Sequence, residues 1–331
     1  PAAQWPLSSA LLPDKTAPQE ARPDRPTHWG RDAMEAPYIL HMLSPLKHVS
    51  PFDVNMALDA GFTTVVPYTA VELGEVRGLV QDAIFSRGPK GAKRTGLFIG
   101  GKNAILALDM LEAARKAMFP PFQASVFADP AGSFTTAAAM VAKVEKALKA
   151  QAEGGLSGRG VAVFGATGVV GFAAAVIAAA EGAKTVLIGY DGIERVRALA
   201  EGAKGRFKVD LAYADGSSEA LKEQAIEGVD VILCAGRAGV QIVSTQQLAK
   251  AANLKVAADV NAVPPAGIEG LGAQDDGVAL KGGRGVGIGS LAIGGIKYKV
   301  EAGLFRKMIE AEKPLCLDFR DAFALARELV G

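Results

Sequence analysis

The sequence has almost no excess of charge of either sign. Its 36 lysines and arginines nearly balance 35 aspartates and glutamates, which leaves a formal net charge of +1. Such a chain, with no basic run interleaved with aromatic residues, has no electrostatic footprint for a phosphate backbone. We therefore expect no nucleic-acid partner.

Cysteines and aromatic residues are also scarce, with two cysteines and 6% aromatic residues. Cys234 and Cys316 stand too far apart in the sequence to form a recognisable metal or redox motif, and both have apolar neighbours. We predict two buried free thiols in a reducing, cytoplasmic compartment, and no metal site.

The chain lacks an unbroken membrane-spanning segment. The longest uncharged stretch, residues 161–180, is long enough, but three glycines interrupt its first half and charged residues follow it. We interpret it as a strand, a turn and a helix, and expect no membrane partner.

Residues 1–37 contain seven of the 17 prolines, little periodicity and no signal-peptide core. They predict a poorly ordered arm or linker, with Met34 as a candidate natural start. The alternative is a native arm that packs on a neighbouring subunit.

Small and apolar residues are abundant: half of the chain is hydrophobic and 39 residues are glycine. This composition favours α/β architecture, in which helices pack closely on buried parallel sheets, and the length suggests two domains. Apolar runs of strand length alternate with helical periodicity from residue 38 onwards. In the first series we predict strands at residues 38–43, 63–67, 96–99 and 124–127, and helices at residues 71–84, 103–118 and 135–150, with another helix beginning at Ser50-Pro51.

A change to glycine and serine at residues 154–160 indicates a hinge between residues 38–153 and a second domain at residues 154–297. Residues 298–329 have a helical pattern. The C-terminal segment, residues 298–331, is a candidate to fold back on the first domain. The second alternating series predicts strands at residues 161–164, 185–188, 208–212, 229–234 and 255–259, followed by a glycine-rich run at residues 285–295.

Three glycines, Gly165, Gly168 and Gly171, follow an apolar strand and open an alanine-rich helix. This is the context of a Rossmann-type dinucleotide site: the first glycine allows a tight turn, the second admits the pyrophosphate, and the third lets helix and strand pack closely. The helix N-terminus would add N–H donors, with Val169 at its first turn. The spacing is G-x-x-G-x-x-G rather than G-x-G-x-x-G, and Thr167 stands near the usual place of the middle glycine.

An acidic residue follows the next predicted strand at the expected distance. Asp191 lies 20 residues beyond Gly171, where an acid usually holds the ribose hydroxyls of NAD. Tyr190 and Asp191 argue against a site built only for a 2′-phosphate, although Arg195 and Arg197 remain able to reach one. We therefore expect NAD, with NADP tolerated.

Two later strands end at the sheet edge where α/β proteins bind their ligands. Small residues at Ala235 and Gly236 would admit the nicotinamide ribose, and Asp259 and Asn261 follow the next strand. All four are predicted cofactor-binding residues.

Four segments resemble one enzyme family: LHMLSPLKH (residues 40–48), FADPAGSFTT (127–136), ADVNAVPPAGI (258–268) and LCLDFRDA (315–322). Together they are similar to the NAD(P)-dependent methylene-tetrahydromethanopterin dehydrogenases of methylotrophic bacteria. The segment at residues 189–192 is closer to the form that uses both NAD and NADP. The resemblance implies a two-domain α/β enzyme with a cleft between the domains, a reduced pterin substrate, a homo-oligomer, and a place in one-carbon (formaldehyde) oxidation.

The implied reaction removes a hydride from a methylene bridge between two pterin nitrogens. Nitrogen lone pairs drive the hydride away, so the enzyme needs positioning and stabilisation of positive charge more than a general base. Asp53 and Asp129 are candidate stabilising carboxylates, and Lys297 would place an ammonium in the cleft. The simpler interpretation is helix capping for the two acids and solvation for the lysine.

Further polar residues would meet the pterin or its tail, although a solvated surface role is equally consistent with the pattern. These predicted substrate-binding residues are Lys47, His48, Lys102, Ser133 and Thr135. Three other functions stay open: a methylene-tetrahydrofolate dehydrogenase, a shikimate-type or amino-acid dehydrogenase, and a non-catalytic NAD(P) sensor.

Overall fold

The computed structural model describes residues 36–152 and 154–331. All of the helices and strands described belong to one compact unit, Pro37–Gly331. The predicted arm therefore lies outside the described residues except at its last two positions, and Met34 lies outside them entirely.

The first sheet has five parallel strands in the order β12-β4-β3-β1-β2. The strand order reverses between β1 and β3, which makes the carboxyl ends of these two strands the expected place for a ligand. The strands are β1 (Ile39–Leu43), β2 (Thr64–Tyr68), β3 (Thr95–Ile99), β4 (Ser125–Ala128) and β12 (Cys316–Leu317).

The second sheet has seven strands in the order β10-β11-β9-β8-β5-β6-β7. All of its pairs are parallel except β10 with β11. From β7 to β11 this is the Rossmann strand order, with the reversal between β5 and β8. The strands are β5 (Gly160–Phe164), β6 (Lys184–Gly189), β7 (Ala212–Asp215), β8 (Val231–Cys234), β9 (Val256–Asp259), β10 (Asp276–Ala279) and β11 (Val286–Ile288).

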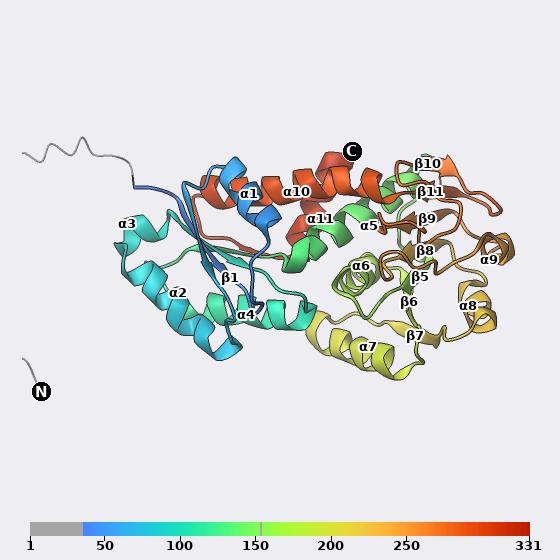
Figure 1. The fold of residues 1–331 in the computed structure, drawn as a ribbon, viewed down its shortest axis with the longest axis horizontal. Coiled ribbons are helices and arrows are strands. Elements are labelled where there is room, and N and C mark those ends of the chain that lie inside the picture. The colour runs from blue at the N-terminus through green and yellow to red at the C-terminus, as the bar shows by residue number, and fades with distance from the viewer. Residues whose placement is uncertain (1–35, 153) are drawn as a thin grey trace, which may run out of the picture. The chain divides into compact units, whose positions relative to one another are not determined.

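Three helices, α5, α10 and α11, pack on one another between the two sheets (Figure 1). None of the helices in the described part of the chain combines the length and apolar character needed to cross a membrane. The α-helices are α1 (Pro51–Ala60), α2 (Val76–Phe85), α3 (Gly88–Ala92), α4 (Ala104–Ala117), α5 (Ser133–Ala150), α6 (Val169–Ala180), α7 (Glu194–Phe207), α8 (Glu219–Ile226), α9 (Thr245–Lys250), α10 (Ser290–Glu310) and α11 (Phe319–Val330), and two short 3-10 helices are η1 (Leu73–Glu75) and η2 (Pro130–Gly132).

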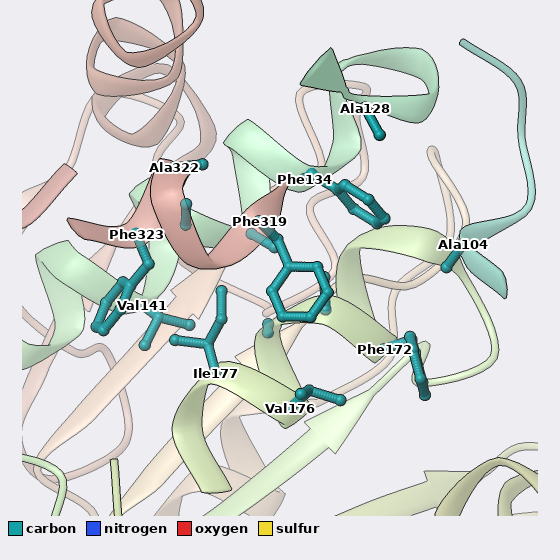
Figure 2. Packing of buried hydrophobic residues seen from close by; sticks show 14 of the residues in the cluster. Ala104, Ala128, Phe134, Val141, Phe172, Val176, Ile177, Phe319, Ala322 and Phe323 are labelled. Atoms are coloured by element: carbon teal, nitrogen blue, oxygen red, sulfur yellow. The ribbon is translucent and has the colours of Figure 1, made fainter. Parts of the chain in front are cut away.

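One hydrophobic core runs from the first sheet through these helices to the second sheet. The Phe319 ring of α11 meets the Phe134 ring of α5 edge to face, with centroids 5.2 Å apart, above the apolar face of α6 (Figure 2). On α10, the Phe305 ring lies 5.4 Å from the rings of both Phe98 and Phe127. Both C-terminal helices are therefore part of this core, and α10 packs directly on the first sheet.

Two predicted elements are displaced. The strand predicted at residues 208–212 is wrong, because α7 continues to Phe207, Lys208 ends it in a left-handed conformation, and β7 begins only at Ala212. The helix predicted at residues 71–84 starts later, since η1 precedes α2.

The C-terminal region differs most from the expectation. Its first helix, α10, begins at Ser290 rather than at residue 298, and the helical pattern is broken at residues 311–318. Pro314 lies in this break, where it removes a backbone donor, and β12 then joins the first sheet. Cys316, on that strand, is exposed, so the prediction of a buried thiol is correct for Cys234 and wrong for Cys316.

Candidate active site

The loops that follow β1 and β3 enclose a hollow of about 360 Å³ at the point where the first sheet's strand order reverses. Three predicted substrate-binding residues, Lys47, His48 and Lys102, line this hollow and are exposed. Asp53 lines it as well, and Ala131 closes it from the loop after β4. The structure therefore brings the predicted cationic loops and one predicted carboxylate to a single cavity.

Asp53 is held in the first turn of α1. Ser50 caps this helix by accepting a hydrogen bond from the Asp53 backbone N–H at 3.4 Å, and Pro51 occupies the first helical position. Asp53 is only 4% exposed, so it contributes to the lining of the hollow from an almost fully buried position.

Asp129 is fully buried at the end of β4 and caps the segment that starts α5. One carboxylate oxygen accepts the backbone N–H groups of Phe134 and Thr135, at 2.8 and 3.3 Å, and the other accepts the Thr135 hydroxyl at 2.6 Å. Thr135 is itself fully buried, and Ser133 is half-buried at the start of α5. Asp129, Ser133 and Thr135 are not among the residues that line the hollow.

Lys297 joins this cluster from α10. Its ammonium contacts the carboxylate of Glu301, one turn further along the helix, and lies 3.8 Å from the centroid of the Phe52 ring. Glu301 has no exposed surface, and its Oε1 has no hydrogen-bond partner among the described residues. Sequence reasoning missed Glu301, whose one signal is the i, i+4 spacing from Lys297.

Burial dominates the electrostatics of this carboxylate cluster, made of Asp53, Asp129, Lys297 and Glu301. Burial, reinforced by the charge of Asp129, raises the pKa of Asp53 to about 6. The same two causes raise the pKa of Glu301 to about 8. Burial also raises the pKa of Asp129, against the lowering effects of Thr135 and Lys297.

Three carboxyl groups therefore share one ammonium, and desolvation disfavours all of their negative charge. A positive charge that develops in the hollow beside Asp53 would relieve this excess, because opposite charges attract strongly where water is excluded. In the described residues, no group of three or more His, Cys, Asp or Glu side chains is arranged to hold a metal ion.

A larger hollow, of about 670 Å³, lies at the carboxyl ends of β5, β6 and β8. It is lined by six of the predicted cofactor-binding residues, namely Gly165, Thr167, Gly168, Tyr190, Ala235 and Gly236.

Two of the three turn glycines have no room for a side chain. A β-carbon on Gly165, whose φ is +71°, would lie 2.1 Å from the Ala235 carbonyl oxygen, and one on Gly171 would lie 2.4 Å from the Gly165 oxygen. Gly168 instead meets only one atom, at 3.3 Å, and directly precedes Val169, the first residue of α6. The turn therefore has the close backbone contacts that the dinucleotide motif requires at Gly165 and Gly171. Gly168, at the start of α6, is the least crowded of the three glycines.

Asp191 and Arg195 form an exposed ion pair beyond the end of β6, at 3.0 Å. The Arg195 guanidinium also donates to the Tyr190 hydroxyl at 3.0 Å. Neither charged residue lines the large hollow, although Tyr190 does. Arg197 pairs with Glu194 instead.

The side chains of Asp259 and Asn261 accept hydrogen bonds from the backbone of neighbouring loops. The Asp259 carboxylate accepts backbone N–H groups from Asn261, Gly267 and Ile268, at 2.9, 2.7 and 3.2 Å. The Asn261 amide oxygen accepts the Gly239 N–H, which ties this loop to the one after β8. Both residues line a third, smaller hollow of about 230 Å³.

Comparison with known proteins relates both halves of the chain to one family. A family model described as methylene-tetrahydromethanopterin dehydrogenase, N-terminal, matches residues 51–131, which include Asp53 and Asp129. An NAD(P)-dependent methylenetetrahydromethanopterin dehydrogenase from Methylorubrum extorquens is 58% identical over 293 residues, covering 88% of this chain and 99% of that protein.

A second protein of Methylorubrum extorquens, the bifunctional protein MdtA, is 34% identical over 280 residues, covering 85% of this chain and 94% of the relative. Among solved structures, an NAD-dependent malic enzyme from Thermotoga maritima shares the fold with a TM-score of 0.55 at 14% identity, covering 89% of this chain and 85% of that one. The fold likeness alone does not bear on the substrate.

Proposed function

The chain belongs to the family of NAD(P)-dependent methylenetetrahydromethanopterin dehydrogenases, and we propose that the hollow beside Asp53 is its pterin site. It is an oxidoreductase that takes a hydride from the methylene bridge of methylene-tetrahydromethanopterin and leaves the methenyl cation. NAD and NADP are its cofactors. The observation that carries the site proposal is that a buried acidic residue, Asp53, lines the hollow and interacts with Lys297 and two further carboxyl groups, those of Asp129 and Glu301.

Asp53 is the residue proposed to meet the developing positive charge. The sequence left the choice between Asp53 and Asp129 open, and access now favours Asp53, because Asp129 has no exposed surface and both of its carboxylate oxygens already accept hydrogen bonds within the protein. In the proposal Asp129 and Lys297 set the charge and position of Asp53 from behind. Thr135 would act by orienting Asp129 rather than by touching substrate, and Ser133 stays a predicted substrate contact.

The polar rim, made of Lys47, His48 and Lys102, is proposed to hold the pterin or its tail. Lys47, His48 and Lys102 stand on loops around the opening, where their side chains are free to follow a flexible ligand. No group in the proposal acts as a general base, because the hydride leaves without a proton moving at the reacting carbon. Catalysis then rests on orientation and charge stabilisation.

The large hollow on the second sheet fits a dinucleotide. The close approach at Gly165 and Gly171 and the open position at Gly168 make a cradle that a side chain would fill. We propose that Gly165, Thr167, Gly168 and Val169 hold the pyrophosphate, and that Asp191 and Arg195 share the adenine ribose and any 2′-phosphate. Ala235 and Gly236 leave room towards the nicotinamide half. The bound cofactor supplies the hydride acceptor.

Domain boundaries, assembly and location are also proposals. Strands β1 to β4 and β12 support a pterin domain at residues 38–153 joined by the C-terminal residues 298–331, and strands β5 to β11 support a nucleotide domain at residues 154–297. Following the family resemblance, we propose a homo-oligomer in the cytoplasm, which light scattering and cell fractionation would test.

The carrier of the one-carbon group is the sharpest point to test. The purified protein is mixed with methylene-tetrahydromethanopterin or methylene-tetrahydrofolate, each with NAD or NADP, and methenyl absorbance is followed. We expect product with methanopterin and both nucleotides. Product with folate alone would favour the folate alternative, and nucleotide binding without product in any of the four mixtures would favour a sensor and refute the proposal.

A further inference from the structure

A third hollow continues the nucleotide edge of the second sheet. It lies at the carboxyl ends of β9 and β11 and is lined by Asp259, Asn261, Gly289 and Ser290, among others. In the sheet order, β9 and β11 stand on the opposite side of the β5–β8 reversal from β6 and β7. A dinucleotide bound across this reversal with its adenine half near β6 extends its other half towards β9 and β11.

Ser290 presents an unused polar group at this hollow. It is the first residue of α10 and is 8% exposed, and its hydroxyl has no hydrogen-bond partner within the described residues. The residue before it, Gly289, provides no side-chain cap for the helix. A buried polar group without a partner is unfavourable, so a ligand that satisfies it gains binding free energy.

The chemistry of the hollow selects a neutral polar group. The start of a 21-residue helix carries a partial positive charge, which suits an acceptor oxygen, although the Leu291 N–H there already donates to the Ala273 carbonyl at 2.8 Å. The carboxylate of Asp259 also lines the hollow, which disfavours a phosphate. A carboxamide carries a strong acceptor and no net charge, and a volume of about 230 Å³ is of the right order for one ring with its substituent and not for a whole nucleotide.

We propose that Ser290 and the N-terminus of α10 bind the carboxamide of the nicotinamide ring. This inference rests on the proposed function, since it assigns one end of that dinucleotide site. Lys297 follows Ser290 by seven residues on the same helix, which corresponds to about 10 Å along its axis. Helix α10 thereby fixes the spacing between the nicotinamide ring and the carboxylate cluster, as a hydride transfer over about 3–3.5 Å requires.

The test compares two ligands in the absence of any pterin. Dissociation constants for NAD⁺ and for ADP-ribose, which lacks the nicotinamide ring, are measured by calorimetry on the full chain. Ser290→Ala is expected to weaken NAD⁺ about three- to tenfold, the effect of one neutral hydrogen bond. The affinity for ADP-ribose is expected to stay within about twofold of the original.

Thr185→Val provides a matched control. Thr185 is a second buried hydroxyl without a partner among the described residues, but it lies near the start of β6, away from the carboxyl edge. This variant should leave the ratio of the two dissociation constants unchanged.

Equal weakening of both ligands by Ser290→Ala would overturn the proposal, because it would show a structural effect only. No weakening of either ligand would overturn it as well. Failure of the pterin proposal would appear as missing methenyl product and would leave the NAD⁺ to ADP-ribose ratio unaffected, so the two failures are distinguishable.

Discussion

Gly132 lies directly against the ammonium of Lys297: a β-carbon added to residue 132 would be 2.9 Å from the lysine Nζ. Residue 132 is also in the left-handed region, with φ +63° and ψ +20°, and follows Ala131, which is left-handed too. The turn after β4 therefore serves two purposes, since it starts α5 and leaves space for the only ammonium in the carboxylate cluster.

Replacing Gly132 by alanine is expected to push Lys297 away from Glu301 and to lower kcat by on the order of tenfold, which corresponds to about 1.4 kcal/mol of lost transition-state stabilisation. The left-handed alanine should cost a further 1–2 kcal/mol of stability, roughly. Activity assays and thermal unfolding measure the two effects. Gly78→Ala, in an exposed helical position with open space around it, is the control. An unchanged kcat in Gly132→Ala would show that the position of Lys297 is unimportant.

Glu301 and Asp53 should make the folded protein less stable as the pH rises. Their pKa values are raised in the folded state, to about 8 and about 6, so between about pH 4 and pH 8 the folded chain binds more protons than the unfolded one. The stability that each protonated carboxyl group contributes is fully present below the pKa that the group has in the unfolded chain. It is lost as the pH rises through the pKa that the group has in the folded protein. Each group contributes a slope of up to about 1.4 kcal/mol per pH unit within its window.

Glu301→Gln isolates one of these groups, because glutamine resembles the protonated acid in shape and charge. We expect the variant to lose most of the fall in the free energy of unfolding between about pH 6 and pH 8, as measured by urea denaturation at several pH values. Glu194→Gln, at an exposed position, should leave the slope as it is. A slope that persists in Glu301→Gln would assign it to other groups.

The carboxylate cluster shows where sequence reasoning ends. Asp53 and Asp129 stand at helix starts, and they became candidates because the reaction implied by the family resemblance calls for a carboxylate. Glu301 lies within α10, where a glutamate four residues after a lysine is typical of a solvated ion pair. Its burial comes from the packing of α10 with helices such as α1, α5 and α11, which depends on contacts far apart in the sequence.

The fold, too, could be predicted from the sequence only where the signal is local. Buried apolar runs predict most parallel strands, because both faces of such strands are covered. The two-residue β12 has no periodicity to detect, and β10 is an edge strand whose residues are all exposed. Sheet order also depends on long-range pairing, so the reversals that position both large hollows could not be obtained from the local pattern.

Asp191 and Arg195 are expected to affect the binding of NAD and NADP in opposite ways. Asp191→Ala should weaken NAD by about tenfold or more and NADP less, because the ribose hydroxyls lose a charged acceptor. Arg195→Ala should do the reverse, since the 2′-phosphate loses its cation. Dissociation constants for the four pairs of variant and nucleotide test this. Equal losses of NAD and NADP in Asp191→Ala would show that Asp191 is not at the ribose.

Alanine substitutions in the β5–α6 turn should have different effects: one at Gly165 should lower stability, and one at Gly168 should weaken nucleotide binding. At Gly165 the methyl group would lie 2.1 Å from the Ala235 carbonyl oxygen and the backbone is left-handed, so the ends of β5 and β8 would have to separate. We expect a loss of at least about 2 kcal/mol in stability there, seen by thermal unfolding.

At Gly168 the φ angle is −82°, and an added methyl group would lie 3.3 Å from one atom, the Gly165 carbonyl oxygen, which would have to shift by a few tenths of an ångström. The methyl group would instead stand at the N-terminus of α6, where the pyrophosphate is proposed to approach the backbone. Gly168→Ala should therefore lose less stability than Gly165→Ala, about 1 kcal/mol or less, and weaken the binding of NAD⁺ and of ADP-ribose to the same extent. That equal loss separates the pyrophosphate contact from the carboxamide contact of Ser290. Normal binding of both ligands by a folded Gly168→Ala protein would place the pyrophosphate elsewhere.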